Sequence, residues 1–460
     1  MWFAIVAAAA AAQQLVVLVV VDQYSLDLHR LAAPSYTEGL ARLSDPTRAE
    51  VGSGRYGHAC TWTAPGHATL GTGAAPAVHG VASNEWFEGD KVVTAGDPKQ
   101  LRVPSIGASA VAAGRTVAAV SLKQRGAMLI AGPDAHAAWL TKAGDGFAWA
   151  GPGAAEGWLP DAAAIQRLRE GAAPTKAPGW PTRPATSPWE GASKDFFATP
   201  AAGTLLVDAA IGALADPALA LGRHKAADLL LVSLSNIDYI GHAYSPESDE
   251  SLLGLQQLDQ DLGRLFGALD ARVGAGQWTL LLTADHGTLP TPAAYVSGNA
   301  LAEAVTARFA ADGLPGRAQF LESALWLRGT DTTKRDRYVA HALAEAATWP
   351  EIAIAFDGAK PVPPGTLARD AAEACRVPER SGDVVFWPRW GLTWAHDPDP
   401  TAADPFPRAA RPTGTSHGSP WAYDTDVPVL VTGAGVRPGP AGLRPQTDVY
   451  TRLKVWMKLP

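Results

Sequence analysis

Cysteine and clustered basic residues are scarce in this chain. Only Cys60 and Cys375 occur among 460 residues, so at most one disulfide bridge can form and a small disulfide-stapled scaffold is excluded. The sequence leaves open whether these two cysteines pair. No run of Lys or Arg is present, and the net charge is -7 with a pI near 5.9. The chain therefore lacks the basic surface of a nucleic-acid-binding protein, and no nucleic acid is expected as a specific partner.

The apolar run at the start of the chain is too short to span a bilayer. Residues 1–14 read MWFAIVAAAAAAQQ and end in small residues, although no Lys or Arg precedes them. This run is similar to the second half of a secretory signal. We therefore expect a signal peptide over residues 1–14 and a periplasmic or secreted protein without a transmembrane anchor. The alternative is that these residues extend the first strand.

Four uninterrupted Val- and Leu-rich runs stand out along the rest of the chain. Runs of this kind are typical of strands that are buried on both faces, and the leucines of residues 251–270 have the spacing of a crossover helix. We therefore predict an α/β fold, a single domain over residues 15–460 with a mostly parallel central sheet and helices on both faces. The four runs are LVVLVVV (15–21), TVAAVSL (116–122), DLLLVSLS (228–235) and WTLLLTA (278–284).

Two stretches depart from this alternation of strands and helices and are predicted to be inserted cap regions, at about residues 133–200 and 290–410. The first is rich in Trp, Pro, Gly and Ala, and the second mixes helical patterns with Pro-rich loops. Tryptophan side chains can stack on a sugar or base, but in an irregular excursion packing is the favoured role. The tryptophans of the first stretch are Trp139, Trp149, Trp158, Trp180 and Trp189.

Asp and His side chains come just after several of the strand-forming runs. Ligands bind beyond the carboxyl ends of parallel strands, so these side chains should converge on one site. Carboxylate and imidazole are zinc ligands, and two zinc ions that keep room for substrate need about six of them. Each residue alone is better explained as a helix cap or a hydrogen-bonded side chain, but the joint pattern predicts a metal site. The six residues are Asp22, Asp238, His242, Asp285, His286 and His417.

The order of these motifs resembles that of the alkaline phosphatase superfamily, in particular the phosphate-irrepressible alkaline phosphatases with a threonine nucleophile. Type I phosphodiesterases and nucleotide pyrophosphatases are related to them. The resemblance extends over about residues 15–436. After Asp22 the motifs are TWTAPGHATLGTG, HGVASNEW, SLKQRGAML, SNIDYIGHAYSP, TADHG and TGTSHGSPWAYDTDVPVL.

The resemblance implies an alkaline phosphatase-like catalytic domain whose cofactors are two zinc ions. It implies that one zinc is held by Asp238, His242 and His417. It implies that the other is held by Asp22, Asp285 and His286 together with the Thr63 oxygen. The phosphoryl oxygens would be held by Asn84, Lys123 and Arg125. Two further histidines, His67 in PGH and His79 in AVHG, are expected to have turn and packing roles.

Thr63 is the expected nucleophile. It directly precedes Ala-Pro-Gly-His, where Pro65 suits the first turn of a helix, and a helix start favours a nearby phosphate. A zinc-bound oxygen also loses its proton far more readily than a free hydroxyl. We therefore expect in-line displacement through a covalent phosphothreonine, with small-molecule phosphate esters as substrates and inorganic phosphate as product. The alternative role for Thr63 is a helix N-cap. A monomer is favoured, although the sequence does not fix the oligomeric state.

The spacing of Lys123 and Arg125 favours a phosphate monoesterase. In an extended segment both side chains would point to one face, where they could hold the non-bridging oxygens of a monoester. The main alternative is a type I phosphodiesterase or nucleotide pyrophosphatase, which need not keep this pair. The CTWTA sequence at Cys60 lacks the Pro and Arg of a sulfatase motif. The intact nucleophile disfavours a non-enzymatic metal-binding module.

The C-terminal segment departs from the family pattern. After VPVLVTGAGVRPGP the resemblance leads us to expect a strand and a closing helix, and TDVYTRLKVWMKLP does not read like them. The reason for this departure is left open, and every predicted site residue lies upstream of it.

Overall fold

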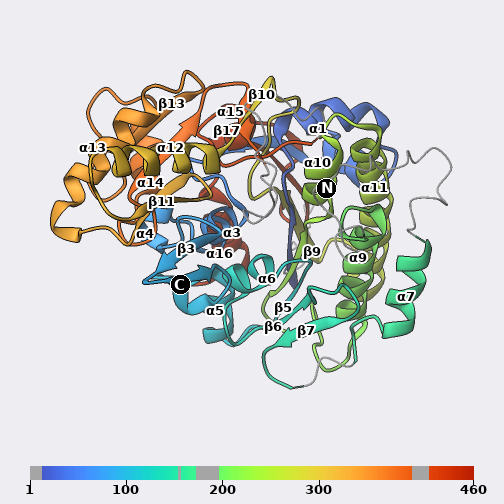
Figure 1. Ribbon diagram of the computed structural model, residues 1–460. Coiled ribbons are helices and arrows are strands. Elements are labelled where there is room, and N and C mark those ends of the chain that lie inside the picture. The colour runs from blue at the N-terminus through green and yellow to red at the C-terminus, as the bar shows by residue number, and fades with distance from the viewer. Residues whose placement is uncertain (1–12, 154–156, 172–195, 396–413) are drawn as a thin grey trace, which may run out of the picture.

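The four apolar runs form adjacent strands at the centre of a nine-stranded sheet (Figure 1). Every residue of these strands is buried, which explains why the runs lack polar alternation. The structure is a computed structural model that describes residues 13–153, 157–171, 196–395 and 414–460. The predicted signal peptide therefore lies outside the described residues, apart from its last two. The four strands are β1 (Leu15–Val21), β5 (Val117–Ser121), β8 (Asp228–Leu234) and β9 (Trp278–Thr283).

The strand order of this sheet is β17-β2-β16-β9-β1-β8-β5-β6-β7. All neighbours from β9 to β6 are parallel, as are β17 and β2. The antiparallel pairs involve β16, which lies between β2 and β9, and the edge strand β7. The predicted mostly parallel sheet is thus confirmed. The outer strands are β2 (Glu50–Arg55), β6 (His136–Leu140), β7 (Phe147–Ala150), β16 (Asp426–Gly433) and β17 (Gly439–Pro445).

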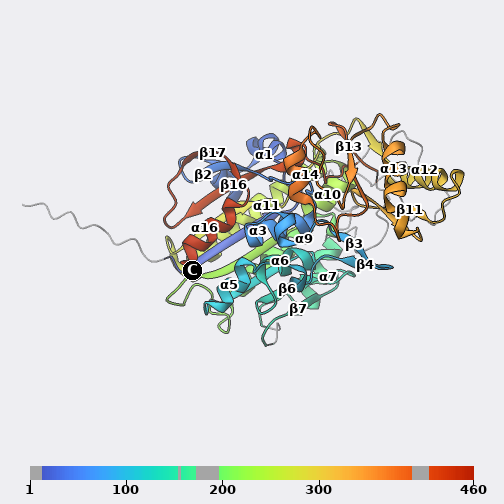
Figure 2. The ribbon, with the colours of Figure 1, turned by 90° about the vertical axis from the view of Figure 1, so that its left-hand side faces the viewer.

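Helices cover both faces of the sheet, as predicted (Figures 1 and 2). Side chains alternate across a strand, so the odd-numbered residues of β1 pack into one core with α9 and α11. The even-numbered residues of β1 pack into a second core with α3, α5, α6 and α16. These helices are α9 (Pro200–Ala215), α11 (Asp249–Leu269), α3 (Thr63–Thr72), α5 (Ile106–Ala112), α6 (Gln124–Ala131) and α16 (Asp448–Met457).

A second, smaller sheet lies within the segment 290–410 and has a hydrophobic core of its own. Its strand order is β11-β12-β14-β13, with every pair antiparallel. Together with three helices it forms the part of the molecule coloured yellow to orange in Figure 1, which we call the cap. Its elements are β11 (Arg317–Leu321), β12 (Ala324–Arg328), β13 (Ile352–Asp357), β14 (Val384–Pro388), α12 (Gly298–Ala311), α13 (Arg335–Ala346) and α14 (Arg369–Cys375).

The remaining described α-helices and strands have ten residues or fewer. None of the described helices has the length and apolar character needed to cross a membrane. These elements are α1 (Leu26–Ala32), α2 (Gly39–Ser44), α4 (Pro76–His79), α7 (Ala162–Gly171), α10 (Asn236–Tyr244), α15 (Ala422–Thr425), β3 (Glu85–Glu88), β4 (Lys91–Thr94), β10 (Ala294–Val296) and β15 (Leu392–Trp394).

The segment 133–200 begins with β6 and β7, which extend the edge of the central sheet. Trp149 and Trp158 pack against each other with ring centroids 5.8 Å apart, and Trp139 packs partly buried against the core. These contacts agree with a packing role for the three residues. Trp180 and Trp189 lie outside the described residues.

The C-terminal segment forms a strand and a closing helix, although its sequence departs from the family pattern. Residues Gly439–Pro445 form β17, which pairs with β2, and Asp448–Met457 form the closing helix α16. Val449, Leu453 and Met457 are buried against the sheet, with the spacing of one helical face. The segment thus keeps the apolar periodicity of an amphipathic helix. Packing of α16 against the sheet requires this periodicity and does not require the sequence motif of the family.

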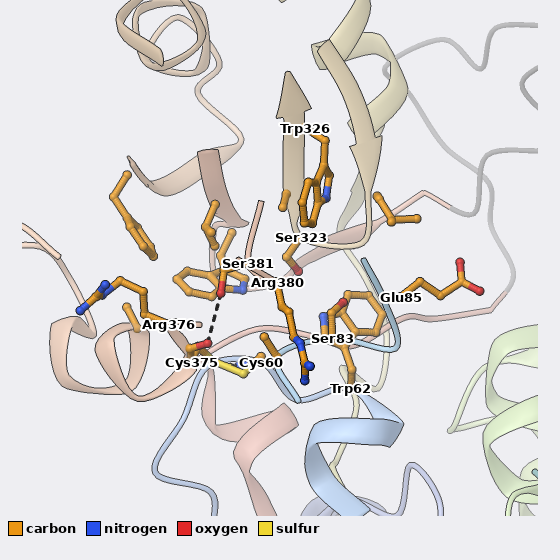
Figure 3. A pocket seen from close by; sticks show the side chains of 17 residues that line it. Cys60, Trp62, Ser83, Glu85, Ser323, Trp326, Cys375, Arg376, Arg380 and Ser381 are labelled. Carbon is orange, nitrogen blue, oxygen red and sulfur yellow. Dashed lines mark hydrogen bonds between the residues drawn. A yellow bond between two sulfur atoms is a disulfide. The ribbon is translucent and has the colours of Figure 1, made fainter. Parts of the chain in front are cut away.

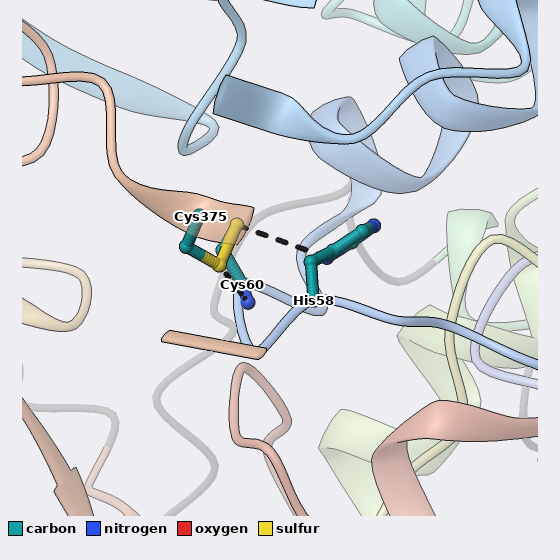
Figure 4. A group of neighbouring side chains, drawn as sticks. All are labelled: His58, Cys60 and Cys375. Atoms are coloured by element: carbon teal, nitrogen blue, oxygen red, sulfur yellow. Dashed lines mark hydrogen bonds between the residues drawn. A yellow bond between two sulfur atoms is a disulfide. The ribbon is translucent and has the colours of Figure 1, made fainter. Parts of the chain in front are cut away.

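A disulfide bridge joins Cys60 and Cys375, so the pairing that the sequence left open does occur. Cys60 lies three residues before Thr63, and Cys375 ends α14 of the cap (Figure 3). His58 Nδ1 lies 3.7 Å from the sulfur of Cys60 (Figure 4). These three residues could bind a metal ion by their spacing, but both sulfurs are used in the bridge. The disulfide therefore acts as a covalent tie between the cap and the segment that precedes α3.

Loss of this bridge is expected to lower the free energy of unfolding by about 2 to 5 kcal/mol, because it closes a loop of 315 residues and so restricts the unfolded chain. Chemical denaturation with and without a reductant would measure the difference. The Cys60→Ser, Cys375→Ser double variant is the control, since reductant should not destabilise it further. Equal stability of the oxidised and reduced wild type would contradict this prediction.

Candidate active site

Acid, imidazole and hydroxyl side chains meet where parallel strands end and one helix begins. Asp22 directly follows β1, and Asp285 follows β9 after one residue. Asp238 lies in the first turn of α10, just beyond β8, and Thr63 is the first residue of α3. Gly66 allows α3 to approach closely, because a side chain there would come within 2.0 Å of the Asp285 carbonyl oxygen. The parallel sheet thus brings residues from distant parts of the chain to one edge.

Asp22, Asp285 and His286 form one group of candidate metal ligands. One ligand atom from each lies within 4.8 Å of the others, and all three side chains are fully buried. His286 Nε2 is 3.3 Å from Asp22 Oδ1 and 3.6 Å from Asp285 Oδ2. Burial opposes protonation of His286, but the carboxylates of Asp285 and Asp22 outweigh it and raise the pKa of the imidazole to about 9. This is the same trio that the resemblance assigned to one zinc.

Asp238, His242 and His417 also lie together. Asp238 Oδ1 is 3.0 Å from His242 Nε2 and 3.6 Å from His417 Nε2. His286 belongs to this neighbourhood as well, because its ring stacks on that of His417 with centroids 3.7 Å apart. Burial, followed by the charge of His286, lowers the pKa of His417 to about 3. His417 is therefore neutral at pH 7, which is the form that binds a metal.

The buried polar atoms of the two groups fit a cation. Asp22 Oδ1, Asp285 Oδ2 and His286 Nε2 are buried and form no hydrogen bond within the described part of the chain. Leaving such atoms unpaired is costly, and a divalent cation between them would remove that cost. The carboxylate and imidazole donors are also those preferred by zinc.

The imidazole rings are oriented by backbone carbonyls, which can only accept. Nδ1 of His242 donates to Thr415 O at 2.7 Å, and Nδ1 of His417 donates to Thr61 O at 2.8 Å. Nδ1 of His286 donates to Gly287 O at 2.9 Å. These bonds place the proton on Nδ1 in the neutral ring, so Nε2 has its lone pair available for a metal.

Thr63 lies at the N-terminus of α3 but does not cap it. The N-cap residue is Trp62, and no side-chain cap hydrogen bond is formed, so the alternative role of Thr63 as an N-cap is wrong. Thr63 is 2% exposed and lines a pocket together with Asp238, His242 and His417. A hydroxyl at this point lies beside the positive end of the helix dipole, where a phosphate is favoured.

Lys123 connects the two groups of candidate ligands. Its ammonium lies 2.8 Å from Asp22 Oδ2 and 2.7 Å from Asp238 Oδ2. Burial lowers the pKa of Lys123, but the charges of Asp22 and Asp238 outweigh it, so the pKa is raised overall. Lys123 is therefore charged and offsets the two carboxylates.

The expectation of an extended segment around Gln124 is wrong. Lys123 is the N-cap residue of α6, and Arg125 lies in the first turn of that helix. The sequence QRGAMLIA has good helix formers at most positions, and these outweigh the period-2 pattern of the two cations. Lys123 and Arg125 nevertheless line the same pocket, because the first turn of α6 opens toward it.

Asn84 lies opposite the start of α3. Its Oδ1 accepts a hydrogen bond from Ala64 N at 2.8 Å, so the amide is held against the first turn of the helix. An amide oxygen used in this way leaves the two Nδ2 hydrogens as donors. Asn84 also lines the pocket, next to Thr63 and Arg125.

The pocket above these residues has a volume of about 640 Å³. One wall is formed by the predicted residues Thr63, Asn84, Lys123 and Arg125. Another wall comes from the cap, with Phe320 and Glu322, and from Trp394 of β15. A cavity of this size, with charged groups on one side and aromatic rings on the other, can hold a small anionic molecule.

Three residues of this neighbourhood were not expected from the sequence. His67 was expected to have a packing role, yet its Nδ1 donates to Thr63 O at 2.8 Å and lies 3.1 Å from Asp285 Oδ2. Its position four residues after Thr63, one helical turn away, is a signal that could have found it. Gln23 donates to Asp238 Oδ1 at 2.9 Å and adopts a φ of 66°. Glu322 reaches the site from the cap, and no local pattern of the sequence marks it.

Comparison with known proteins identifies the family and the fold of the chain. The model of the family described as type I phosphodiesterase / nucleotide pyrophosphatase matches residues 16–420. The alkaline phosphatase PhoK of a Sphingomonas species is 27% identical, over 96% of this chain and 87% of PhoK. The crystal structure of the alkaline phosphatase PafA superposes with a TM-score of 0.80 at 21% identity, covering 98% of this chain and 97% of that one. Murine ectonucleotide pyrophosphatase / phosphodiesterase 5 superposes with a TM-score of 0.57 at 15% identity, covering 97% and 96%.

The family model covers most of the chain, and the fold of PafA is shared over nearly its whole length. The chain therefore belongs to the type I phosphodiesterase / nucleotide pyrophosphatase family, within the alkaline phosphatase superfamily of hydrolases.

Proposed function

We propose that this hydrolase is a zinc-dependent alkaline phosphatase that acts on phosphate monoesters of small molecules through a covalent phosphothreonine at Thr63. The observation that carries the proposal is that Thr63, Lys123, Arg125 and the ligand group of Asp238, His242 and His417 line one pocket. Lys123 also contacts Asp22 of the second, buried ligand group. The relatives that are named alkaline phosphatases support the same reaction class.

In this mechanism the Thr63 oxygen attacks phosphorus in line with the ester oxygen. The new bond from Thr63 to phosphorus forms as the bond to the ester oxygen breaks, and the alcohol leaves with a proton. Water then attacks the phosphothreonine from the opposite side, which releases inorganic phosphate and restores the Thr63 hydroxyl. Zinc ions, held by the two ligand groups described above, would supply Lewis-acid stabilisation of the reacting oxygens.

The chain's own donors would hold the transferred phosphoryl group. The N-terminus of α3 places the positive end of a helix dipole beside Thr63. Arg125 can donate two hydrogen bonds to phosphoryl oxygens, Lys123 supplies a point charge, and the Nδ2 hydrogens of Asn84 add neutral donors. Three donors suit the three non-bridging oxygens of a monoester better than the two of a diester. This match is the reason for preferring a monoesterase.

A phosphodiesterase or nucleotide pyrophosphatase is the second candidate function. It is favoured by the description of the matching family and by the shared fold of murine phosphodiesterase 5. Both candidates use the same nucleophile and metal ligands, so the preference between monoester and diester has to be measured.

The Lys123→Ala, Arg125→Ala double variant tests this preference. Hydrogen bonds to charged groups contribute about 1.5 to 3 kcal/mol each, so the loss for a monoester should be on the order of a hundredfold or more in kcat/KM. A diester carries one less charge and should lose much less. Parallel rates for a monoester and a diester, measured on zinc-loaded wild type and variant, give the ratio.

Arg125→Ala alone is the matched control, because Lys123 also pairs with Asp22 and Asp238 and its removal disturbs both carboxylates. Metal content is measured for every variant. Equal losses of kcat/KM for the monoester and the diester would mean that Lys123 and Arg125 only support the fold. The protein would then be better described as a phosphodiesterase.

We also propose a periplasmic or secreted location. The disulfide between Cys60 and Cys375 supports it, because such bridges persist in oxidising compartments. Detection of the mature chain in a periplasmic or culture-medium fraction, with Cys60 and Cys375 oxidised, is the expected result.

A further inference from the structure

The β11–β12 hairpin of the cap reaches into the candidate active site through its tip. Leu321, the last residue of β11, pairs with Ala324, the first residue of β12, so Glu322 and Ser323 form a two-residue turn. Glu322 has a φ of 53°, a conformation that favours Gly or Asn in such turns and strains a glutamate. Strain of this kind persists where the surrounding structure enforces it, and it is concentrated at functional sites. The turn itself therefore gives no reason for a glutamate at this position.

The contacts of Glu322 give that reason. Its Oε2 accepts hydrogen bonds from the hydroxyl of Ser83 and from the backbone N of Asn84, the latter at 2.9 Å. Burial raises the pKa of Glu322 to about 7, although its bonds with Ser83 and Asn84 act in the opposite direction. The neighbouring Ser323 hydroxyl donates to Gly418 O at 3.2 Å, next to His417. The tip of the hairpin thus touches both the Asn84 loop and the loop that carries a candidate metal ligand.

Asn84 is fixed at three atoms by three different elements. Glu322 holds its backbone N, Ala95 N donates to its backbone O at 2.7 Å, and Ala64 N donates to its side-chain Oδ1 at 2.8 Å. With these atoms fixed, the side-chain amide is held at the pocket that Asn84 lines with Thr63, and its Nδ2 hydrogens remain as donors. Of the three anchors, only Glu322 comes from the cap.

We propose that Glu322 is a positioning residue of the cap, which holds Asn84 in the geometry needed to bind a phosphoryl oxygen. This inference rests on the proposed role of Asn84 in the hydrolysis of a phosphate ester. It assigns to the cap a direct part in building the phosphoryl site, in addition to forming a wall of the pocket. Glu322 acts through Asn84 and is not itself required to touch the substrate.

The Glu322→Gly variant tests the proposal, because glycine adopts the observed φ without strain and removes the whole side chain, including the carboxylate that holds Asn84. The expected result is a midpoint of thermal unfolding that is equal to or above that of the wild type, with kcat/KM lowered about ten- to hundredfold through misplacement of Asn84. The affinity for inorganic phosphate as a product inhibitor should fall in parallel. Glu322→Asn also tolerates this φ but is too short to reach Asn84 N, so it should behave like Glu322→Gly. Glu322→Gln keeps an acceptor oxygen and should recover most of the lost activity.

A double-variant cycle with Asn84→Ala separates positioning from a general structural effect. In the Asn84→Ala background, Glu322→Gly should have little further effect, because the residue through which it acts is gone. Glu85→Gln is the matched control: it removes the adjacent carboxylate, which accepts from Thr94 and not from Asn84, and its effect should add to that of Asn84→Ala. Wild-type kcat/KM in Glu322→Gly, or equal losses in both backgrounds, would overturn the proposal.

The cycle does not depend on the preferred substrate. It is run with whichever ester, monoester or diester, the wild type hydrolyses, so a failed monoester preference leaves it intact. If the wild type hydrolyses neither ester, the proposed function fails, and calorimetric titration with inorganic phosphate replaces the rates in the same cycle.

Discussion

Replacing Thr63 with alanine is expected to abolish nearly all ester hydrolysis while the fold and the metal content are retained. The covalent route needs an oxygen at the start of α3, and alanine has none to offer. Loss of a nucleophile of this kind lowers kcat by about a thousandfold or more. The Thr63 hydroxyl forms no cap hydrogen bond, so the stability of the fold should not depend strongly on it. Asp22, Asp285 and His286 form a ligand group without Thr63, so zinc binding should not depend strongly on it either. Rates, zinc content and the unfolding midpoint measured on one preparation give the result.

Two variants serve as controls for Thr63→Ala. Thr63→Ser keeps a hydroxyl and should retain measurable turnover. Thr72→Ala removes a hydroxyl from the last turn of the same helix, where it bonds to Ala68 O, and should remain active. In quenched wild-type protein, the phosphate should be found on Thr63 by mass spectrometry. Phosphate on another residue, or an active Thr63→Ala variant, would assign the nucleophile elsewhere.

Removal of metal with a chelator is the second change expected to have a very large effect. About two zinc ions per chain should be found by elemental analysis, and exhaustive chelation should abolish turnover until zinc is restored. The chelated protein should also unfold at a lower temperature, because a ligand present at a thousand times its Kd stabilises the native state by about 4 kcal/mol. This second readout does not depend on activity. The expected stabilisation by metal follows from the buried atoms of Asp22, Asp285 and His286 that form no hydrogen bond in the described part of the chain.

A matched variant distinguishes the metal site from general destabilisation. His417→Ala removes one candidate ligand, so its zinc content should fall and the difference in unfolding temperature between its zinc-loaded and chelated forms should shrink. His79→Ala also removes a buried histidine, one that bonds to Val81 N and Thr69 outside the two ligand groups, and should keep full zinc content. Full activity of the wild type after exhaustive chelation would exclude the two-metal mechanism.

The apolar runs were sufficient to predict the centre of the fold. Strands β1, β5, β8 and β9 coincide with the four runs to within one or two residues, because a strand buried on both faces has no polar positions that would obscure its limits. The leucine pattern of 251–270 likewise became α11, at Asp249–Leu269. The expectation of an extended segment around Gln124 was wrong, and the C-terminal segment is regular in structure although its sequence departs from the family pattern. The segment around Gln124 is helical, and the C-terminal segment forms both β17 and α16.

The sequence by itself determined the sheet, the family and the candidate ligand set, because buried strands and Asp and His residues placed after them leave a pattern along the chain. Only the tertiary structure decided which of these residues meet, and that His286 lies close to both ligand groups. It also revealed His67, the disulfide to the cap and Glu322 beside Asn84. Glu322 and Asn84 are 238 residues apart, and their contact forms because residues near each of them, such as Trp86 and Ala324, pack into one shared core. Local sequence carries no periodicity or spacing that records an interaction of this kind.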